Sequence, residues 1–361
     1  MAKKTTLKRD DSADWYKLES ELVDVYLSHT TAGASVLTNS LSVGKEFRDQ
    51  IGSSVGMALE RLSASNSSVR EALMNPGTLT ILRGGLNFDL NDAIERVVNV
   101  PPEASFMTSQ RAVQNGEALV TDDSYRRYNL AGSKSLIIGD IAATGRTICN
   151  ALTRIASDVK DSVSDLEIVI VVVGTRNFLA RFEKFVESEI GQFYIKRGCR
   201  FSVIFLESIF SVFEGLAGPL GRLTQTDFIR YGSTSTPGYL KTSLQSPIGL
   251  LERCTIYDGG VRSFEPRVHL RGLRNYWSAV RALVDFDRSA FDEFVSSQQV
   301  YKRNTNMYNP AQDTEHSPTE SLDIETDAVF REHALAGLST SFDELVAQID
   351  AHLATISQKS K

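Results

Sequence analysis

The fold of this 361-residue chain is constrained most strongly by three aliphatic runs. Each of them is followed or preceded by a stretch with helical periodicity. They lie at 135–139, 168–174 and 201–207, and the middle one reads IVIVVVG. A strand that is apolar on both faces is typical of a parallel sheet with helices on both sides. The sequence therefore predicts an α/β fold with a doubly wound, mainly parallel sheet.

Apolar residues at helical spacing predict the other main elements. Trp15, Leu18, Leu22 and Val25 fall on one face of a predicted N-terminal helix. The same argument predicts helices at 45–62, 90–98, 147–159, 178–188, 273–286 and 342–356. Residues 79–82 and 104–110 predict strands, and the polar segment 111–134 is interpreted mainly as a loop.

The character of the sequence changes after about residue 215, where Gly, Ser, Thr and Pro become frequent. Residues 254–264 resemble a hairpin with Asp258-Gly259 as its turn, and 303–327 are polar. We predict an N-terminal helix at 1–30, a core at 31–215 and a C-terminal extension at 216–361.

Composition excludes several classes of protein. The formal net charge is -6, with acidic and basic residues interspersed, which argues against a dedicated nucleic-acid binder. The start of the chain lacks the apolar stretch of a signal peptide, and no aliphatic run is long enough to span a bilayer. Cys149, Cys199 and Cys254 lack metal-ligand spacing and are interpreted as thiols of a reducing compartment. We therefore expect a cytoplasmic protein that does not contact membranes.

A carboxylate followed by small residues and two threonines stands between strand 135–139 and helix 147–159. Ligands of open parallel sheets bind beyond the carboxyl ends of the strands, and helix N-termini attract anions. Asp140 is suited to sugar hydroxyls, while the loop that follows it is suited to a phosphate. The loop residues that could contact the phosphate are Ala142, Ala143, Thr144, Gly145 and Thr147. The alternative is a plain strand-to-helix turn with an N-cap threonine.

Two common phosphate-binding motifs are absent from this segment. A Walker A loop needs a Lys after its last Gly, and a dinucleotide fingerprint needs three spaced glycines. The pattern therefore favours a sugar phosphate over a nucleoside triphosphate or a dinucleotide.

The segment LIIGDIAATGRT resembles the motif with which type I phosphoribosyltransferases bind 5-phosphoribosyl pyrophosphate (PRPP). Asp140, Thr144, Gly145 and Thr147 match the motif. Gly139 stands where the family has the first of two adjacent acids, which hold the ribose hydroxyls. Arg146 stands where a small residue is frequent, and it is either a further phosphate ligand or a solvent-exposed side chain.

Upstream, TILRGGLNFD resembles the pyrophosphate loop of uracil-type phosphoribosyltransferases. The resemblance implies that Arg83, Gly84 and Gly85 form a diphosphate-binding turn. It also implies a mobile loop at 109–120, to which Arg111 contributes a cation. In total it covers residues 45 to 210, just under half of the chain.

The resemblance implies transfer of the 5-phosphoribosyl group to a small-molecule acceptor with release of pyrophosphate. Arg83 and Asp140 would be the catalytic residues, and Mg²⁺ would be carried by the diphosphate of PRPP rather than by a protein cage. The C-terminal extension would form the hood that recognises the acceptor. Pro237, Gly238 and Tyr239 are its candidate contacts, although the Gly-Asp pair of uracil-type members does not follow. We also expect a homodimer.

Two other functions remain open at this stage. One is a non-catalytic sensor of PRPP or a nucleotide, and the other is the reverse reaction, pyrophosphorolysis of a nucleotide.

Two further clusters have a functional and a structural interpretation. Asp122-Asp123 is either a Mg²⁺ contact or a solvated turn, and the basic run 267–274 is either an acceptor site or a solvent-facing helix start.

Overall fold

The structure is a computed structural model that describes residues 14–18, 20–114, 117–212, 228–243, 248, 262–291 and 342–360. The chain divides into two compact units. The first, here called the sheet unit, comprises 7–33 and 48–209. The second, called the C-terminal unit, comprises 1–6, 34–47 and 210–361.

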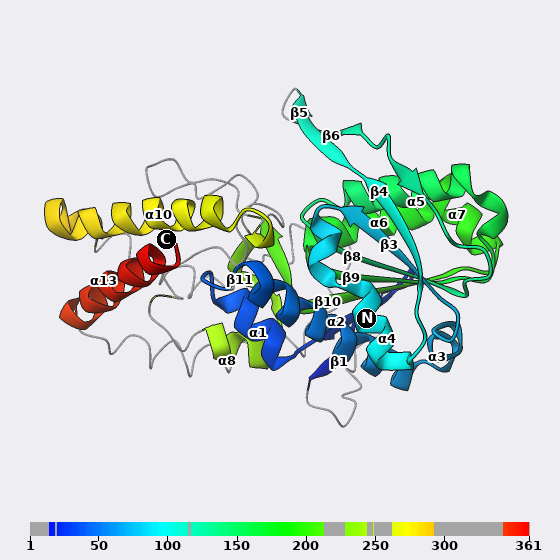
Figure 1. The fold of residues 1–361 in the computed structure, drawn as a ribbon, viewed down its shortest axis with the longest axis horizontal. Coiled ribbons are helices and arrows are strands. Elements are labelled where there is room, and N and C mark those ends of the chain that lie inside the picture. Colours follow the sequence, from blue (N-terminus) through cyan, green and yellow to red (C-terminus); the bar gives the residue numbers. More distant parts are fainter. Residues whose placement is uncertain are drawn as a thin grey trace, which may run out of the picture. The chain divides into compact units, whose positions relative to one another are not determined.

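Nine strands of the described residues form one sheet, with the order β1-β2-β10-β9-β8-β3-β4-β7 and β11 paired to β10 (Figure 1). Their bounds are β1 (Trp15–Leu18), β2 (Asp24–Ser28), β3 (Pro76–Leu82), β4 (Glu103–Thr108), β7 (Arg126–Arg127), β8 (Ser135–Ala142), β9 (Glu167–Thr175), β10 (Arg200–Val212) and β11 (Phe228–Ser235). Strands β8 and β9 are buried along their whole length, as their aliphatic sequences require.

The six central strands run parallel. The pairs β2/β10, β8/β9, β3/β8 and β3/β4 are parallel, whereas the outer strands β1 and β7 are antiparallel to their neighbours. At the start of β9 and β10, the amide of Arg200 donates to the carbonyl of Leu166 (3.0 Å). The amide of Asp165 likewise donates to the carbonyl of Arg197 (2.8 Å). The amino ends of β9 and β10 therefore lie together, and all six carboxyl ends share one edge.

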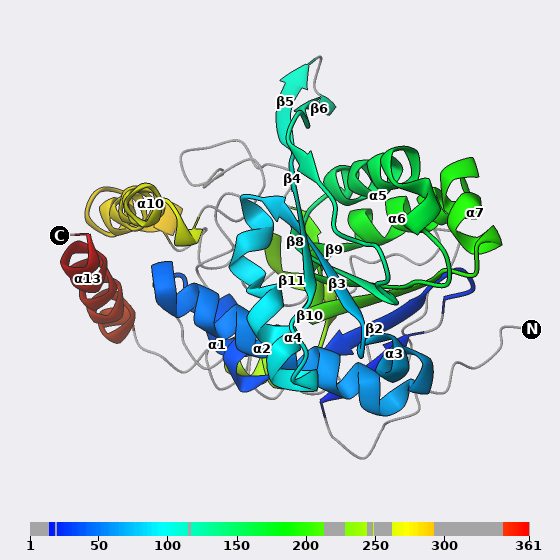
Figure 2. The same ribbon diagram turned by 45° about the vertical axis from the view of Figure 1, so that its right-hand side comes forward.

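Helices cover both faces of this sheet. Figure 2 shows α5, α6 and α7 on one side, with α2, α3 and α4 on the other. Their bounds are α2 (Gly44–Ser65), α3 (Ser67–Ala72), α4 (Leu90–Val98), α5 (Arg146–Asp158), α6 (Arg176–Glu187) and α7 (Glu189–Lys196), with the short 3₁₀ helices η1 (Gly84–Phe88) and η2 (Lys160–Ser162). The prediction of a mixed α/β fold around a mostly parallel sheet is confirmed.

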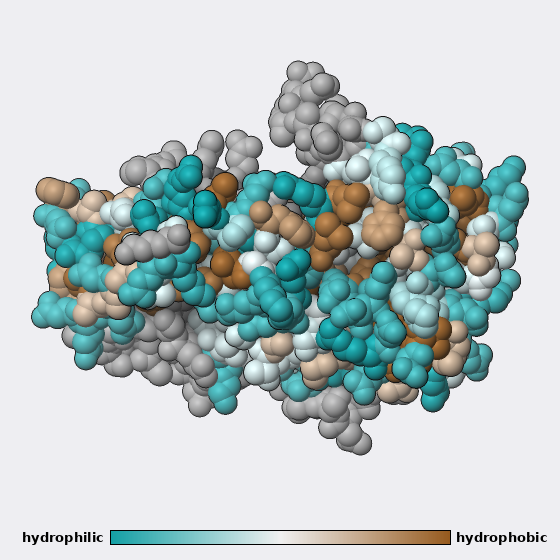
Figure 3. Space-filling view, in the orientation of Figure 1, coloured by the Kyte–Doolittle hydropathy of each residue, from teal (hydrophilic) through white to brown (hydrophobic). Residues whose placement is uncertain are grey.

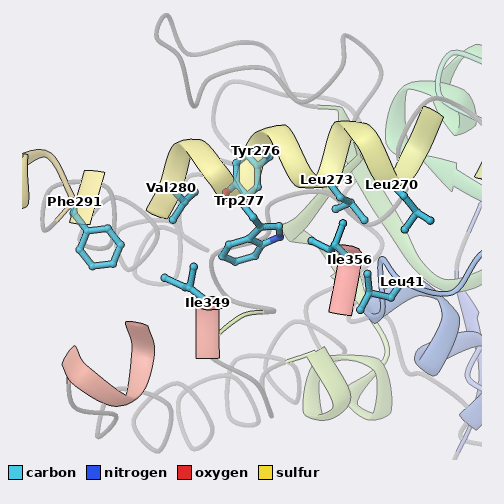
Figure 4. Close-up of a cluster of buried hydrophobic side chains, with 9 residues drawn as sticks. All are labelled: Leu41, Leu270, Leu273, Tyr276, Trp277, Val280, Phe291, Ile349 and Ile356. Carbon is cyan, nitrogen blue, oxygen red and sulfur yellow. The ribbon is translucent and has the colours of Figure 1, made fainter. Parts of the chain in front are cut away.

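The C-terminal unit has its own apolar core. Helices α10 (Pro266–Phe286) and α13 (Phe342–Lys359) pack together, and Trp277 lies fully buried between them (Figure 4). The cluster comprises Leu41, Leu270, Leu273, Tyr276, Trp277, Val280, Phe291, Ile349 and Ile356. The two remaining helices are α1 (Thr31–Thr38), which starts in the sheet unit, and α8 (Pro237–Ser243).

Nothing in the described part of the chain has the length and apolar character of a membrane-spanning helix. On the face drawn in Figure 3, hydrophilic residues cover most of the surface, and hydrophobic residues form separate small patches. Scattered apolar patches of this kind are ordinary on globular proteins.

The predicted N-terminal helix is wrong. Its described residues form the antiparallel strands β1 and β2, in which the rings of Trp15 and Tyr26 stack with centroids 4.8 Å apart. Leu22, placed on the helical face by the periodicity, lies between the strands and is 38% exposed. The parallel partner β10, distant in sequence, supplies the hydrogen bonds that hold β2 as a strand.

The interpretation of 111–134 as mainly a loop is also wrong. This segment contains the antiparallel hairpin of β5 (Gln110–Gln114) and β6 (Glu117–Asp122), followed by β7. The hairpin pairs with itself and projects from the sheet unit (Figure 1). The predicted hairpin at 254–264 lies almost entirely outside the described residues, and the polar stretch 303–327 and Cys254 lie wholly outside them.

Candidate functional site

Two loops meet at the carboxyl edge of the sheet. Strand β3 ends at Leu82 and leads through Arg83 into η1, while β8 ends at Ala142 and leads into α5 at Arg146. Strands β3 and β8 are parallel neighbours, with Thr80 opposite Gly139. The two segments that resemble the PRPP loops therefore lie side by side.

Close packing of η1 on β8 requires the glycines of the first loop. A Cβ atom on Gly84 would lie 2.7 Å from Oδ1 of Asp140, and one on Gly85 would lie 3.1 Å from the carbonyl oxygen of Gly139. Real Cβ atoms essentially never approach another atom to 2.7 Å, and a contact of 3.1 Å would require the backbone of Gly139 to shift by a few tenths of an ångström. Asp140 is 8% exposed, and its Oδ1 accepts a hydrogen bond from the amide of Ile141 (2.8 Å). The carboxylate is thereby held beside the Gly84 turn.

The second loop ends at the N-terminus of α5. Gly145 is the N-cap residue, and no side chain caps this helix end. Its φ of +68° lies in the left-handed region, and a Cβ atom there would lie 2.6 Å from Cδ2 of Phe178, so glycine is required on both grounds. The first amides of α5 and the helix dipole favour an anion at this position.

Thr175 fixes the loop from the neighbouring strand. It ends β9, donates its hydroxyl to the carbonyl oxygen of Ala143 and accepts from the amide of Phe178 (3.2 Å). The hydroxyl oxygen of Thr144 is buried and has no hydrogen-bond partner within the described part of the chain. The sequence analysis did not select Thr175, although a threonine between an apolar strand and a helix is an N-cap signal.

The loop is shorter than predicted. Ile141 and Ala142 belong to β8 and are buried, so only residues 143–145 separate the strand from the helix. Arg146 and Thr147 are the first residues of α5, and Thr147 is 8% exposed. The expectation that Ala142 is a loop residue is therefore wrong.

Gly139 does not face the position expected for the sugar. A Cβ atom on Gly139 would lie 2.6 Å from Cβ and 2.7 Å from Cγ of Phe88, which is fully buried in η1. A carboxylate at this position would collide with the Phe88 ring. The first acid of the resembled motif is therefore incompatible with this packing.

The two candidates near the hairpin have different outcomes. The backbone of Arg111 lies in β5, and its side chain is outside the described structure, as is that of Asp122. Asp123 accepts hydrogen bonds from Nε of Arg154 (2.5 Å) and Nδ2 of Asn150 (3.3 Å), both on α5. Desolvation opposes ionisation of Asp123, but the hydrogen bonds from Asn150 and Arg154 and the charges of Arg154 and Arg126 together lower its pKa. Asp123 thus ties the chain before β7 to α5.

The acceptor candidates Pro237, Gly238 and Tyr239 form the start of α8 in the C-terminal unit. Tyr239 is fully buried and packs edge-on against Phe210, with ring centroids 5.8 Å apart. Its ring is a core side chain of the C-terminal unit, and the role of Tyr239 as an acceptor contact stays a prediction. The basic run 267–274 lies on α10, with Arg267, Arg271 and Arg274 exposed.

The donor set of the site fits an anion better than a bare cation. Among the described residues, no three His, Cys, Asp or Glu side chains gather in a way that could hold a metal ion. Asp140 supplies a single carboxylate, whereas a protein-bound Mg²⁺ needs six oxygen ligands. A magnesium ion at this edge would therefore take most of its ligands from a bound diphosphate and water.

Comparisons with known proteins do not identify a family. No protein-family model matches the chain, and no curated protein matches it. Among solved structures, the chain is similar at 13% identity to a hypothetical protein from Neisseria gonorrhoeae with bound ppGpp, over 34% of this chain and 66% of that one. It thus spans just under two thirds of that protein's length, and the TM-score of 0.23 carries no argument about fold or ligand.

Proposed function

We propose that this protein transfers the 5-phosphoribosyl group of PRPP to a small-molecule acceptor and releases pyrophosphate. The observation that carries the proposal is the packing of the Gly84 turn against Asp140, with the free N-terminus of α5 at the same edge. PRPP has anionic groups at both ends of a ribose. The adjacent loops offer one site for each anion and a carboxylate between them for the sugar.

Each group has a distinct role in this proposal. The amides at the start of α5 bind the 5′-phosphate. Asp140 accepts hydrogen bonds from ribose hydroxyls and lies near the positive charge that develops on the ribose. Arg83, whose side chain is exposed, and the amides of Gly84 and Gly85 stabilise the leaving diphosphate.

The chemistry is a substitution at C1 of the ribose. The acceptor forms a bond to C1 while the C1–O bond breaks, and its electron pair leaves with the diphosphate. Bound Mg²⁺ supplies positive charge to the diphosphate. The protein's main contribution is to hold both ends of PRPP in a fixed orientation.

The setting of the reaction follows from the sequence. The acidic, mixed-charge composition fits specialised or nucleotide metabolism in the cytoplasm, and we include a homodimer in the proposal. Reverse pyrophosphorolysis would use the same groups.

One observation favours a second candidate function, a non-catalytic sensor of PRPP or a nucleotide. Phe88 fills the position of the first motif acid, so the site has one carboxylate fewer for the sugar. A sensor needs affinity but no turnover. Pyrophosphate release therefore separates the two functions.

Calorimetry with magnesium–PRPP tests the proposal directly. Ligand at 100 times its dissociation constant should stabilise the fold by about 2.7 kcal/mol, and ribose 5-phosphate should compete. Arg83→Ala should weaken the binding of magnesium–PRPP, and Arg70→Ala is its matched control, because Arg70 is exposed on α3 before the amino end of β3, at the opposite edge of the sheet. If magnesium–PRPP gives neither a heat of binding nor thermal stabilisation of the wild-type protein, the proposal is refuted.

A further inference from the structure

A buried carboxylate and a histidine form a pair at the same edge of the sheet, outside the two loops. His29 follows β2, and Glu207 stands opposite it on β10. Nδ1 of His29 lies 2.6 Å from Oε2 of Glu207. Both residues belong to the sheet unit.

The surroundings fix the carboxylate of Glu207. Its Oε1 accepts from the amide of Thr30 (2.7 Å), and Thr30 Oγ1 in turn bonds to Ser54 Oγ (2.8 Å). A Cβ atom on Gly33 would approach Oε1 of Glu207 to within 2.4 Å, so this glycine makes room for it. Glu207 also has a φ of +68°, a conformation that non-glycine residues adopt rarely and that concentrates at functional sites.

The pair differs from an ordinary buried ion pair in its exposure. The side chain of Glu207 is 0% exposed, whereas that of His29 keeps 15%. Because Glu207 engages Nδ1, the nitrogen of His29 available to another molecule is Nε2. A histidine held by a buried carboxylate at one nitrogen is the usual arrangement of a proton-transfer group.

The position of the pair fits the acceptor side of the proposed reaction. Strands β10 and β9 separate β2 from β8, which gives about 14 Å from three strand spacings. In the proposed function the leaving diphosphate binds over β3, and β3 lies on the side of β8 that faces away from β9 and β10. In-line displacement brings the acceptor to the opposite side of C1, over β9 and β10 and toward His29.

We propose that Nε2 of His29 takes the proton from the acceptor as that acceptor bonds to C1 of PRPP, with Glu207 as the positioning residue. This inference rests on the proposed function. The N–H or O–H electron pair of the acceptor forms the bond to C1, and the C1–O pair leaves with the diphosphate. The proton then passes from His29 to solvent. The acceptor class is therefore a weak N–H or O–H acid, not a ring nitrogen that attacks through a free lone pair.

The electrostatics of the pair support this role. Burial and the charge of Arg61 lower the pKa of His29. The hydrogen bond and charge of Glu207, together with the charge of Asp14, outweigh them, so the pKa of His29 is raised overall. Arg61 also donates to the carbonyl oxygen of His29. A base works best with a pKa near the working pH, and these groups hold His29 above its ordinary 6.5.

The test measures pyrophosphate release from magnesium–PRPP between pH 5.5 and 9. The acceptors are uracil, orotate and hypoxanthine, which lose a proton, and nicotinate, which does not. We expect release with at least one of the first three, and none above the background with nicotinate. His29→Gln should lower the rate about 10²–10⁴-fold, remove the acidic limb of the pH profile and leave magnesium–PRPP affinity unchanged. Glu207→Gln should shift that limb to lower pH.

Glu167→Gln is the matched control. Glu167 is also a buried carboxylate of this sheet, but it pairs with Arg200 at the opposite, amino edge, so its variant should keep the acidic limb. Carbethoxylation of His29 in the wild-type protein tests the same role and does not depend on the folding of a variant. Pyrophosphate release should be lost at the same rate at which mass spectrometry shows His29 to be modified.

Three results would overturn the assignment of His29. They are an unchanged pH profile in His29→Gln, full activity after modification of His29, and binding of magnesium–PRPP with no release for any of the proton-bearing acceptors. Calorimetry with the wild-type protein tests the proposed function separately. If magnesium–PRPP does not bind to the wild-type protein, both the proposed function and this inference are refuted.

Discussion

Replacement of Gly139 by alanine tests how the two loops are packed. The added Cβ would lie 2.6, 2.7 and 2.9 Å from Cβ, Cγ and Cδ1 of Phe88, whereas carbon atoms in contact are about 3.5–4.0 Å apart. Phe88 is fully buried, so η1 must move by about 1 Å to relieve the collision. Overpacking of this kind lowers the free energy of unfolding by about 1–3 kcal/mol.

The displacement should also reach the ligand site, because η1 begins at Gly84. We therefore expect Gly139→Ala to weaken magnesium–PRPP binding as well as stability. Phe88→Ala alone should cost about 3–5 kcal/mol. In the double variant the new methyl group occupies space vacated by the ring, so the combined loss should fall short of the sum by about 1–3 kcal/mol.

Urea denaturation of the full chain measures these energies. The sequence contains two tryptophans, Trp15 in the sheet unit and Trp277 in the C-terminal unit, so a Trp277→Phe background reports the sheet unit. Gly56→Ala is the matched control, since its Cβ would meet its nearest atom, the carbonyl oxygen of Ala93, at 3.7 Å. In mid-helix this change should be neutral or stabilise by up to about 1 kcal/mol. If Gly139→Ala proves as harmless as the control, or the double variant is additive, the assigned packing is wrong.

Three further predictions follow from the same structure. Arg83→Ala should lower turnover about 10²–10³-fold, measured by steady-state kinetics, while calorimetry shows little change in the affinity for ribose 5-phosphate. Unchanged turnover with weakened ribose 5-phosphate binding would mean that the diphosphate and the 5′-phosphate have been assigned to the wrong loops. Gly145→Ala should abolish the heat of ribose 5-phosphate binding, because neither the left-handed φ nor the contact with Phe178 leaves room for a side chain. An unchanged heat of binding would mean that the N-terminus of α5 is not the phosphate site. Burial, and to a smaller extent the charge of Arg262, lower the pKa of His269 to about 3. The neutral histidine therefore contributes its full stability to the C-terminal unit above pH 6.5, the pKa of an unfolded histidine. This contribution, on the order of a few kcal/mol, is lost as the pH falls from 6.5 toward 3. Trp277 fluorescence in a Trp15→Phe background should follow this loss during denaturation at several pH values, and His269→Gln should flatten it.

Local sequence determined the class of fold. Residues 136–138 of β8 and 168–173 of β9 are aliphatic at every position, and only a strand covered on both faces satisfies that pattern. Helices α2, α5 and α10 carry apolar residues at a spacing that places them on one face, so their existence and approximate bounds also follow from sequence. The small residues before α5 likewise mark a tight turn without further information.

Strand pairing decided what local pattern could not. Residues 15–25 carry apolar side chains that fit a helical face and two short strands equally well, and the pairing of β2 with β10 selects the strands. In the same way, the sequence identifies Gly139 as a departure from a motif but not the direction in which its side chain would point. The packing of Phe88 from η1 fixes that direction.

The His29–Glu207 pair shows the limit most clearly. The two residues are 178 positions apart, and each is unremarkable in its own segment. They meet because β2 and β10 run parallel with a register that brings the residues after Ser28 and Leu206 together. Periodicity is a property of neighbouring residues, so sequence alone predicts the elements, whereas register across a sheet depends on the burial of both faces at once and is decided only by the tertiary structure.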